Sequence, residues 1–317
     1  MANIVLLNRC NLKCPYCFAQ SYTGMEREDI DINSFMSLLD FCACEGKVGL
    51  IGGEPFLHKE INTFLDILRN DWRISLVTVF TNGIFMDKSF DLLTHPKFKL
   101  LVNLNSPKDI SEKSFLRAVE NIKSALSFMP KDKLDLGINV YEENQDFGDF
   151  LSVVRELRLK RVRISVVIPH DKSEGGISYF KRMKPTLLKL YKSLYELGVC
   201  PCYDCNAIPE CVFTKEELSF LATLPFENDF EREIFLGKRS VCSPVIDLYP
   251  DQTATRCFGM SEPRIPIKDF KNIGDLGNFF FKEIDCRLVN NLSCENCESC
   301  YKFKTFSCYG GCLCYKK

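Results

Sequence analysis

Hydrophobic residues in the first two-thirds of the chain follow two alternating spacings. Short, continuous apolar runs, typical of buried strands, recur six times. They occupy residues 3–7, 48–51, 74–80, 100–104, 134–141 and 162–168. Between these runs, apolar residues return every three or four positions, which is the spacing of a helix with one buried face. The pattern therefore predicts strands and helices in alternation.

The helical spacing is found in five segments. Four of them cover residues 35–42, 61–68, 115–126 and 150–157, and a fifth, from Pro185 to Leu197, completes a sixth strand–helix unit. Asp31 or Asn33 is expected to cap the first helix. Alternation of this kind predicts a parallel sheet with right-handed crossovers. Six units without a closing pair predict an α/β fold, a partial (β/α)6 barrel related to the eight-stranded TIM barrel.

The pattern of residues along the sequence changes after Gly198. Regular apolar spacing fades, and seven of the eighteen cysteines lie between Cys286 and Cys314. Metal coordination is expected to replace part of the missing hydrophobic core there. The sequence therefore predicts two domains, a barrel over residues 1–198 and a small cysteine-rich, metal-binding domain over residues 199–317.

Composition narrows the classes of function. The 317 residues include 41 basic and 42 acidic side chains, a balance that disfavours nucleic-acid binding. No apolar run is long enough to span a membrane, and the run from Met1 to Leu7 ends too early for a signal peptide. We therefore expect a cytoplasmic protein with neither nucleic-acid nor membrane partners. In that reducing compartment, many cysteines indicate metal or redox chemistry rather than disulfides.

Three cysteines follow the first predicted strand at close spacing: Cys10, Cys14 and Cys17. Their loop lies at the carboxyl end of a barrel strand, the rim on which barrel enzymes build active sites. Three thiolates on one short loop suit an iron–sulfur cluster better than a closed four-ligand zinc site. A missing fourth protein ligand leaves one iron open to another molecule.

The spacing Cys-x3-Cys-x-aromatic-Cys, with Tyr16 as the aromatic residue, resembles the cluster motif of the radical S-adenosylmethionine (SAM) superfamily. The second strand ends in Gly52, Gly53, Glu54 and Pro55, which is similar to that family's Gly-Gly-Glu-Pro motif. The resemblance implies that this stretch holds the amino group of the methionine moiety. Glycines allow close approach of the backbone, and a carboxylate suits an ammonium group.

The same resemblance implies a catalytic [4Fe–4S] cluster whose open iron binds SAM, and reductive cleavage of SAM to a 5′-deoxyadenosyl radical. Tyr16 is then expected beside the adenine. Polar residues at the ends of the third, fourth and fifth strands are further candidates for cofactor binding: Thr81, Asn82, Asn103, Asn105 and Asn139. For each asparagine the alternative is a structural role, because strand-end amides often satisfy loop backbone.

The C-terminal region resembles the SPASM extension, which binds auxiliary [4Fe–4S] clusters in the same superfamily. Cys242 and Cys257, with fourteen residues between them, fit the first half of its pattern, although Gln252 stands where the pattern has glycine. By this resemblance the nearer cluster takes Cys242, Cys257 and Cys312. The farther cluster takes Cys297, Cys300, Cys308 and Cys314, with Cys294 as the main alternative.

Cys200, Cys202, Cys205 and Cys211 lie outside that pattern. Three interpretations remain open. Cys205 or Cys211 supplies a further ligand to the nearer cluster, the group forms a separate metal site, or one thiol quenches radicals.

The resemblance to SPASM proteins implies an oxidoreductase-like peptide maturase that acts on ribosomally made peptides (RiPPs) or small proteins. Its product would be a thioether or carbon–carbon crosslink, an epimerised residue or an oxidised side chain. A flavodoxin- or ferredoxin-type reductant is an expected partner. Because the first strand starts within three residues of Met1, no leader-recognition domain is expected before the barrel, and a separate leader-binding protein is a candidate partner.

Two other functions remain as alternatives. One is a radical SAM dehydrogenase or related enzyme that acts on a small molecule such as an alcohol or amino sugar. The other is a non-catalytic iron–sulfur electron carrier, which the Gly-Gly-Glu-Pro stretch disfavours because a carrier needs no methionine-binding rim.

Overall fold

The computed structural model describes residues 1–17, 29–169, 171–203, 205–206, 208–238, 242 and 245–316. The chain divides into two compact units. The first combines residues 1–136 with 244–281, and the second combines residues 137–243 with 282–317. The predicted domain division between residues 198 and 199 stays a prediction.

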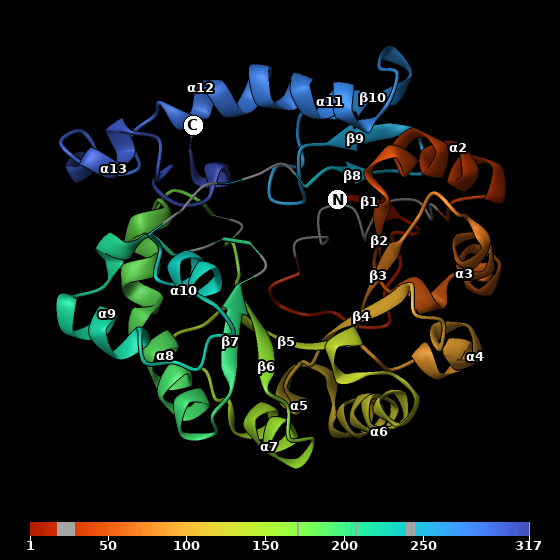
Figure 1. Ribbon diagram of the computed structural model, residues 1–317, viewed down its shortest axis with the longest axis horizontal. Coiled ribbons are helices and arrows are strands. Elements are labelled where there is room, and N and C mark those ends of the chain that lie inside the picture. The colour runs from red at the N-terminus through yellow and green to blue at the C-terminus, as the bar shows by residue number, and fades with distance from the viewer. Residues whose placement is uncertain are drawn as a thin grey trace. The chain divides into compact units, whose positions relative to one another are not determined.

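The first unit is built on parallel strands that neighbour one another in chain order. These strands are β1 (Ala2–Val5), β2 (Lys47–Ile51), β3 (Leu76–Thr81) and β4 (Phe98–Asn103). The helices between and after them are α2 (Ile32–Cys42), α3 (Ile61–Asn70), α4 (Phe90–Leu93), α5 (Pro107–Ile110) and α6 (Glu112–Phe128). Figure 1 shows α2, α3, α4 and α6 along one side of these strands. The loops at the carboxyl ends of the strands therefore share one edge.

A late segment of the chain extends the same sheet beyond β1. Strand β8 (Asp247–Leu248) pairs with β1 in parallel, and β9 (Thr253–Thr255) and β10 (Ile265–Pro266) follow in antiparallel order. Helix α11 (Ile273–Phe280) comes next. These strands are too short to show any periodicity, which is why the sequence did not predict them.

The second unit continues the parallel pattern. Strand β5 (Leu134–Val140), whose last residues belong to this unit, pairs with β6 (Arg161–Val166), and β6 pairs with β7 (Cys200–Tyr203). The helices are α7 (Gly148–Glu156), α8 (Gly176–Glu196), α9 (Lys215–Leu221), α10 (Asp229–Phe235), α12 (Cys286–Val289) and α13 (Tyr301–Lys304).

The alternation of strands and helices confirms the predicted α/β fold with a partial (β/α)6 barrel, and all six predicted strands are present. In α2 the buried residues are those of the predicted stripe, Phe35, Leu38, Leu39 and Cys42. Asp31 caps this helix, since its carboxylate accepts a hydrogen bond from the backbone of Ser34 at 2.8 Å.

The predicted start of the fifth helical segment at Pro185 is wrong. Helix α8 begins at Gly176 and carries Pro185 in its interior. Proline removes one backbone donor from a helix and crowds the preceding turn. Burial of Tyr179, Phe180 and Met183 in the first half of α8 offsets this cost.

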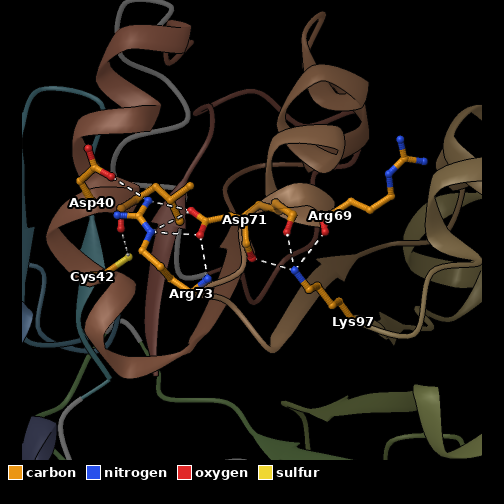
Figure 2. A network of polar contacts seen from close by, with 8 residues as sticks. Asp40, Cys42, Arg69, Asp71, Arg73 and Lys97 are labelled. Atoms are coloured by element: carbon orange, nitrogen blue, oxygen red, sulfur yellow. Dashed lines mark hydrogen bonds and ion pairs between the residues drawn. The ribbon is translucent and has the colours of Figure 1, made fainter.

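Figure 2 shows a polar network that braces the first unit near the amino end of β3. The Arg73 guanidinium donates three hydrogen bonds to the carboxylate of Asp71, at 3.0, 3.2 and 2.7 Å, and forms an ion pair with Asp40 of α2 at 2.8 Å. The Lys97 ammonium donates to the backbone carbonyls of Arg69 and Asp71, at 3.0 and 2.7 Å. Helix ends leave such carbonyls without partners. The network therefore supports the end of the strands opposite to the loop that holds the three cysteines.

Within the residues that the structure describes, no helix combines the length and the apolar character that crossing a bilayer requires.

Candidate active site

The loop after β1 brings three thiols together. Cys10, Cys14 and Cys17 are all partly exposed and free of disulfides. A backbone hydrogen bond of 3.1 Å from Cys17 to Cys14 closes a turn between them, and the Leu12 amide donates to the Cys10 sulfur at 3.4 Å. Amide groups that donate to sulfur favour the thiolate form.

Burial opposes ionisation of these thiols. The pKa of Cys10 is raised to about 11 and that of Cys14 to about 12, mainly by desolvation and in part by the negative charges of neighbouring thiolates. A bound cation relieves both effects, because metal ligands bind in the deprotonated form. In the described part of the chain, no group of three or more His, Cys, Asp or Glu side chains is arranged for a single metal ion. A four-iron cluster is larger than a single ion and separates its ligands more widely. Thiolates are the usual ligands of such clusters, so the three thiols of this loop suit one.

The two glycines at the end of β2 let the backbone pack directly on the cysteine loop. Gly53 donates to the carbonyl of Leu7 at 2.9 Å, and Glu54 donates to the carbonyl of Arg9 at 2.8 Å. A Cβ atom on Gly53 would lie 1.9 Å from the Arg9 carbonyl oxygen, which no side chain tolerates. Gly53 is therefore required for the contact between the Gly-Gly-Glu-Pro stretch and the cysteine loop.

Glu54 connects the ends of β2 and β3. Its buried carboxylate accepts from the Thr81 hydroxyl at 2.7 Å, from the Asn82 amide at 2.8 Å and from the Phe56 amide at 3.2 Å. Burial raises the pKa of Glu54 to about 7, against the effect of these donors. Among the described residues Oε1 accepts two hydrogen bonds and Oε2 one, so Oε2 keeps capacity for a further donor such as an ammonium group.

Asn82 links this carboxylate to the cluster loop. Its side-chain amide donates to the Asn11 side-chain oxygen at 2.9 Å and lies 4.0 Å from the Cys10 sulfur. Its own side-chain oxygen accepts from the backbone of Ile84 at 3.1 Å. Asn82 therefore fixes the position of the cysteine loop relative to the end of β3.

The remaining candidates are divided between the two units. In the first unit the Tyr16 hydroxyl donates to the side-chain oxygen of buried Asn105, just beyond β4, and Asn103 is the last residue of β4. In the second unit Asn139 accepts from the guanidinium of Arg163 at 3.5 Å. The assignment of all these residues to cofactor binding stays a prediction.

Sequence reasoning missed one feature of the loop. Arg9 forms two hydrogen bonds with Asp29, at 3.0 and 2.6 Å, and Leu7 makes an antiparallel bridge with Asp29. Bidentate pairs of this kind are strong and fix geometry. The pair therefore holds Arg9, at the start of the cysteine loop, against Asp29, which lies shortly before α2. No periodic signal could have paired two residues twenty positions apart.

The structure gathers the cysteines of the second unit into two groups. In the first group, Cys242 and Cys314 both hydrogen-bond with Cys312, and the sulfurs of Cys312 and Cys314 are 3.1 Å apart. The second group contains Cys294 and Cys297, whose sulfurs are 3.5 Å apart, together with Cys211, Cys300 and Cys308.

Two predicted ligands lie in neither group as described. Cys257 belongs to the first unit, where it forms a bridge with Met260, and Cys205 is partly exposed in the second unit. The predicted pairing of ligands with auxiliary clusters stays a prediction.

Sequence comparison places this site in a known family. The profile of the radical SAM superfamily matches residues 4–154. The GTP 3',8-cyclase of Chlorobaculum tepidum is 30% identical over 92 residues, which are 28% of this chain and 28% of that protein. The antilisterial bacteriocin subtilosin biosynthesis protein AlbA of Bacillus subtilis is 33% identical over 107 residues, 33% of this chain and 23% of that protein. These matches span less than a third of the relatives' length.

A longer match joins this chain to the GTP 3',8-cyclase of Campylobacter jejuni strain RM1221. The two are 25% identical over 242 residues, which cover 72% of this chain and 73% of that protein.

Solved structures agree on the fold. The structure of native anSMEcpe with bound AdoMet has a TM-score of 0.66 at 18% identity and covers 98% of this chain and 88% of its own. That of Streptococcus suis SuiB bound to precursor peptide SuiA has a TM-score of 0.59 at 15% identity and covers 98% and 71%. The family and cofactors expected from the motifs are thus confirmed. Residues 4–154 are a radical SAM domain, whose cofactors are a [4Fe–4S] cluster and S-adenosylmethionine.

Proposed function

We propose that this chain is a radical SAM enzyme that modifies a peptide or small protein. The observation that carries the proposal is the extent of the likeness to SuiB and anSMEcpe, which covers 98% of this chain and so includes the cysteine-rich residues after the barrel. Both of those proteins have been solved with bound peptides. The resemblance to AlbA, a bacteriocin biosynthesis protein, supports the same substrate class.

In this proposal the residues of the first unit have separate roles. Cys10, Cys14 and Cys17 hold the catalytic cluster, Glu54 accepts the methionine ammonium, and Tyr16 lies beside the adenine. When bound, the cluster and SAM supply a 5′-deoxyadenosyl radical that abstracts a hydrogen atom from the substrate. Asn82 holds the cysteine loop and Glu54 in fixed positions relative to each other, because it forms hydrogen bonds to both.

The C-terminal cysteines are proposed to hold auxiliary [4Fe–4S] clusters. None of these cysteines forms a disulfide among the described residues, which suits the proposed cytoplasmic location. A flavodoxin- or ferredoxin-type reductant is a proposed partner. A separate leader-binding protein is a proposed partner. The modification is a crosslink, an epimerisation or a side-chain oxidation.

A second candidate is a small-molecule substrate. It rests on the GTP 3',8-cyclases, one of which matches 72% of this chain. GTP and small-molecule alcohols or amino sugars are therefore alternative substrates that the same assay must include.

The test uses anaerobically reconstituted full-length protein with reductant and SAM. Separate reactions contain small peptides encoded beside the gene, GTP, or no substrate, and mass spectrometry follows both substrate and 5′-deoxyadenosine. A mass change in one peptide supports the proposal. Conversion of GTP with no change in any peptide would favour the small-molecule candidate.

Cys14→Ala provides the first prediction. Because it removes one of three cluster ligands, 5′-deoxyadenosine formation should fall to the level of a protein-free reaction. The matched control is Cys44→Ala, which replaces an exposed thiol of a short helical turn after α2 and should keep the activity of the unsubstituted protein. Equal activity of both variants would overturn the assignment of the cluster.

A further inference from the structure

Cys211 lies far from the C-terminal cysteines in the sequence but beside them in the second unit. It occupies a short turn, Glu210–Val212. The Glu210 carboxylate forms an ion pair with Lys302 of α13, and a Cβ atom on Gly311 would lie 3.6 Å from the ring of Pro209. The two residues before Cys211 therefore lie beside the C-terminal segment.

Four C-terminal thiols are brought together by successive turns. Cys297 donates its backbone amide to Cys294 at 2.9 Å, and Cys300 donates to Cys297 at 3.2 Å. A backbone hydrogen bond of 3.1 Å from Cys308 to Lys302 then folds the chain back. The Gly310 amide donates to the Cys308 sulfur at 3.2 Å, and a Cβ atom on Gly310 would lie 3.8 Å from the Cys297 sulfur. The Cys297 and Cys308 thiols thus flank Gly310.

The charges that act on the Cys211 thiol agree with this placement of its turn. Burial is the main cause that raises the pKa of Cys211 to about 11, and four thiolates add to it, those of Cys308, Cys294, Cys297 and Cys300. Interactions between charges weaken with distance, so these side chains lie close to Cys211.

The ammonium group of Lys316 lies near the same thiols. Lys316 donates to the carbonyls of Val289 and Asn291, at 3.1 and 2.7 Å, and these bonds hold its ammonium group in a fixed position. The thiolates of Cys297 and Cys308 are the charges that act on this ammonium group. A positive charge beside several thiolates offsets part of the negative charge of a thiolate-ligated cluster.

The Cys314 thiol belongs to the other group of cysteines. Its sulfur lies 3.1 Å from that of Cys312, in the group that also contains Cys242. A group formed by Cys297, Cys300 and Cys308 therefore needs another fourth thiol.

We propose that Cys211 is that fourth ligand, and that it completes an auxiliary [4Fe–4S] site with Cys297, Cys300 and Cys308. The inference rests on the auxiliary clusters of the proposed function. A ligand from outside the C-terminal run means that the metal fastens the turn after β7 to the end of the chain. Cys294, 3.5 Å from Cys297, is the competing thiol for the same position.

The test starts from full-length protein with Cys10, Cys14 and Cys17 replaced by alanine, so that only auxiliary iron remains. Cys211→Ser, Cys294→Ser and the control Cys44→Ser are compared after anaerobic reconstitution. Cys211→Ser should lose ~4 irons per chain or shift the electron paramagnetic resonance signal of the reduced protein, since serine is a poorer ligand for iron. Cys44→Ser should retain both iron and spectrum. Unchanged iron and spectrum in Cys211→Ser, or their loss in Cys294→Ser alone, would overturn the proposal.

Alkylation of the protein without any substitution at Cys211 gives a second readout. The Cys211 residue as a whole is exposed, but burial of its thiol raises the pKa to about 11, and only the thiolate reacts with iodoacetamide. Labelling at about pH 9 should therefore be faster before reconstitution than afterwards. Mass spectrometry of the peptide that contains Cys211 measures the two rates. Equal labelling in both states contradicts the proposal even if the serine variant misfolds. Neither readout depends on SAM cleavage or peptide modification, so failure of the proposed function is recognised separately.

Discussion

At the scale of single residues, one buried carboxylate organises much of the candidate site. Glu54 receives hydrogen bonds from the side chain of Thr81 and from the backbone of Asn82. Asn82 in turn reaches the loop of Cys10 through Asn11. In the proposed function, a change at Glu54 therefore affects SAM binding directly, while the three proposed thiol ligands remain in place.

Glu54→Gln tests this role. The amide oxygen can still accept from Thr81, but the amide nitrogen faces the Asn82 amide and can accept neither that bond nor one from an ammonium group. Hydrogen bonds to charged groups contribute about 1.5–3 kcal/mol, so the dissociation constant for SAM should rise roughly 10- to 100-fold. The cluster absorbance should stay unchanged.

Equilibrium binding of SAM to the reconstituted protein measures the effect. Glu112→Gln, an exposed position in the first turn of α6, makes the same chemical change away from the site and serves as the control. A dissociation constant for Glu54→Gln equal to that of the control would mean that Glu54 has only a structural role.

The residues at the ends of the strands could be predicted because parallel strands bring their carboxyl ends to one edge. The residues that these side chains contact could not be predicted from the sequence. The Arg9–Asp29 pair and the contact between Tyr16 and Asn105 depend on how distant loops meet, and neither spacing nor composition encodes that. The close packing of Gly53 on Arg9 likewise explains why glycine is needed at this position, which the motif alone did not explain.

At the scale of secondary-structure elements, prediction succeeded where a buried stripe was long. Helices α2 and α3 bury the residues that their spacing indicated, because each has three turns facing a sheet. It failed for α8, where burial of the first half overrides an internal proline. The prediction also failed for β8, which is set by pairing with β1, and for β9, which is set by pairing with β8.

The turn between β8 and β9 shows how one element departs from a family pattern. Gln252, at the position where the SPASM pattern has glycine, has φ of 61°, in the left-handed region that favours glycine. Its side-chain oxygen accepts from Ser37 of α2 at 2.9 Å. This bond to α2 offsets part of the backbone strain, so the turn is kept without the glycine.

The junction of β8 with β1 contains a buried acid. Asp247 is fully buried and accepts from the side-chain amide of Asn3 at 2.8 Å. Within the described residues, neither the second carboxylate oxygen of Asp247 nor the side-chain oxygen of Asn3 has a hydrogen-bond partner. A protonated Asp247 has a hydrogen to donate and thereby relieves this deficit. Burial indeed raises the pKa of Asp247 to about 7.

This acid predicts a pH dependence of stability. The ordinary pKa of aspartate is about 3.9, so between about pH 4 and pH 7 the folded state binds more protons than the unfolded state. The free energy of unfolding should therefore fall as pH rises through that window and level off above it. Asp247→Asn removes one of the two buried acids whose pKa burial raises to about 7, the other being Glu54, and should reduce the slope in this part of the profile.

Chemical denaturation of the reconstituted protein from about pH 5.5 to about pH 8 measures the slope. Asp269→Asn, at an exposed position, should keep the slope of the unsubstituted protein. If Asp247→Asn also keeps it, Asp247 is ionised throughout and the junction is held in another way.

At the scale of the whole molecule, the thiols divide by unit and by chemistry. The first unit has three cysteines on one loop beside the Gly-Gly-Glu-Pro stretch, whereas the second unit has two groups, one around Cys312 and one around Cys297. The family could be predicted from the first unit because its motifs have fixed spacing. The thiol groups of the second unit could not be predicted, because Cys211 and Cys314 come close to their neighbours only in the folded chain.

This division predicts the iron content. One catalytic and two auxiliary [4Fe–4S] clusters correspond to ~12 irons per chain in fully reconstituted protein, and replacement of Cys10, Cys14 and Cys17 by alanine should leave ~8. Iron analysis of the triple variant, with electron paramagnetic resonance after reduction, measures the remainder. About 4 irons would mean that the two thiol groups of the second unit share one cluster. Negligible iron with bound zinc would show that these thiols hold a structural metal, because zinc supports folding but carries no electron.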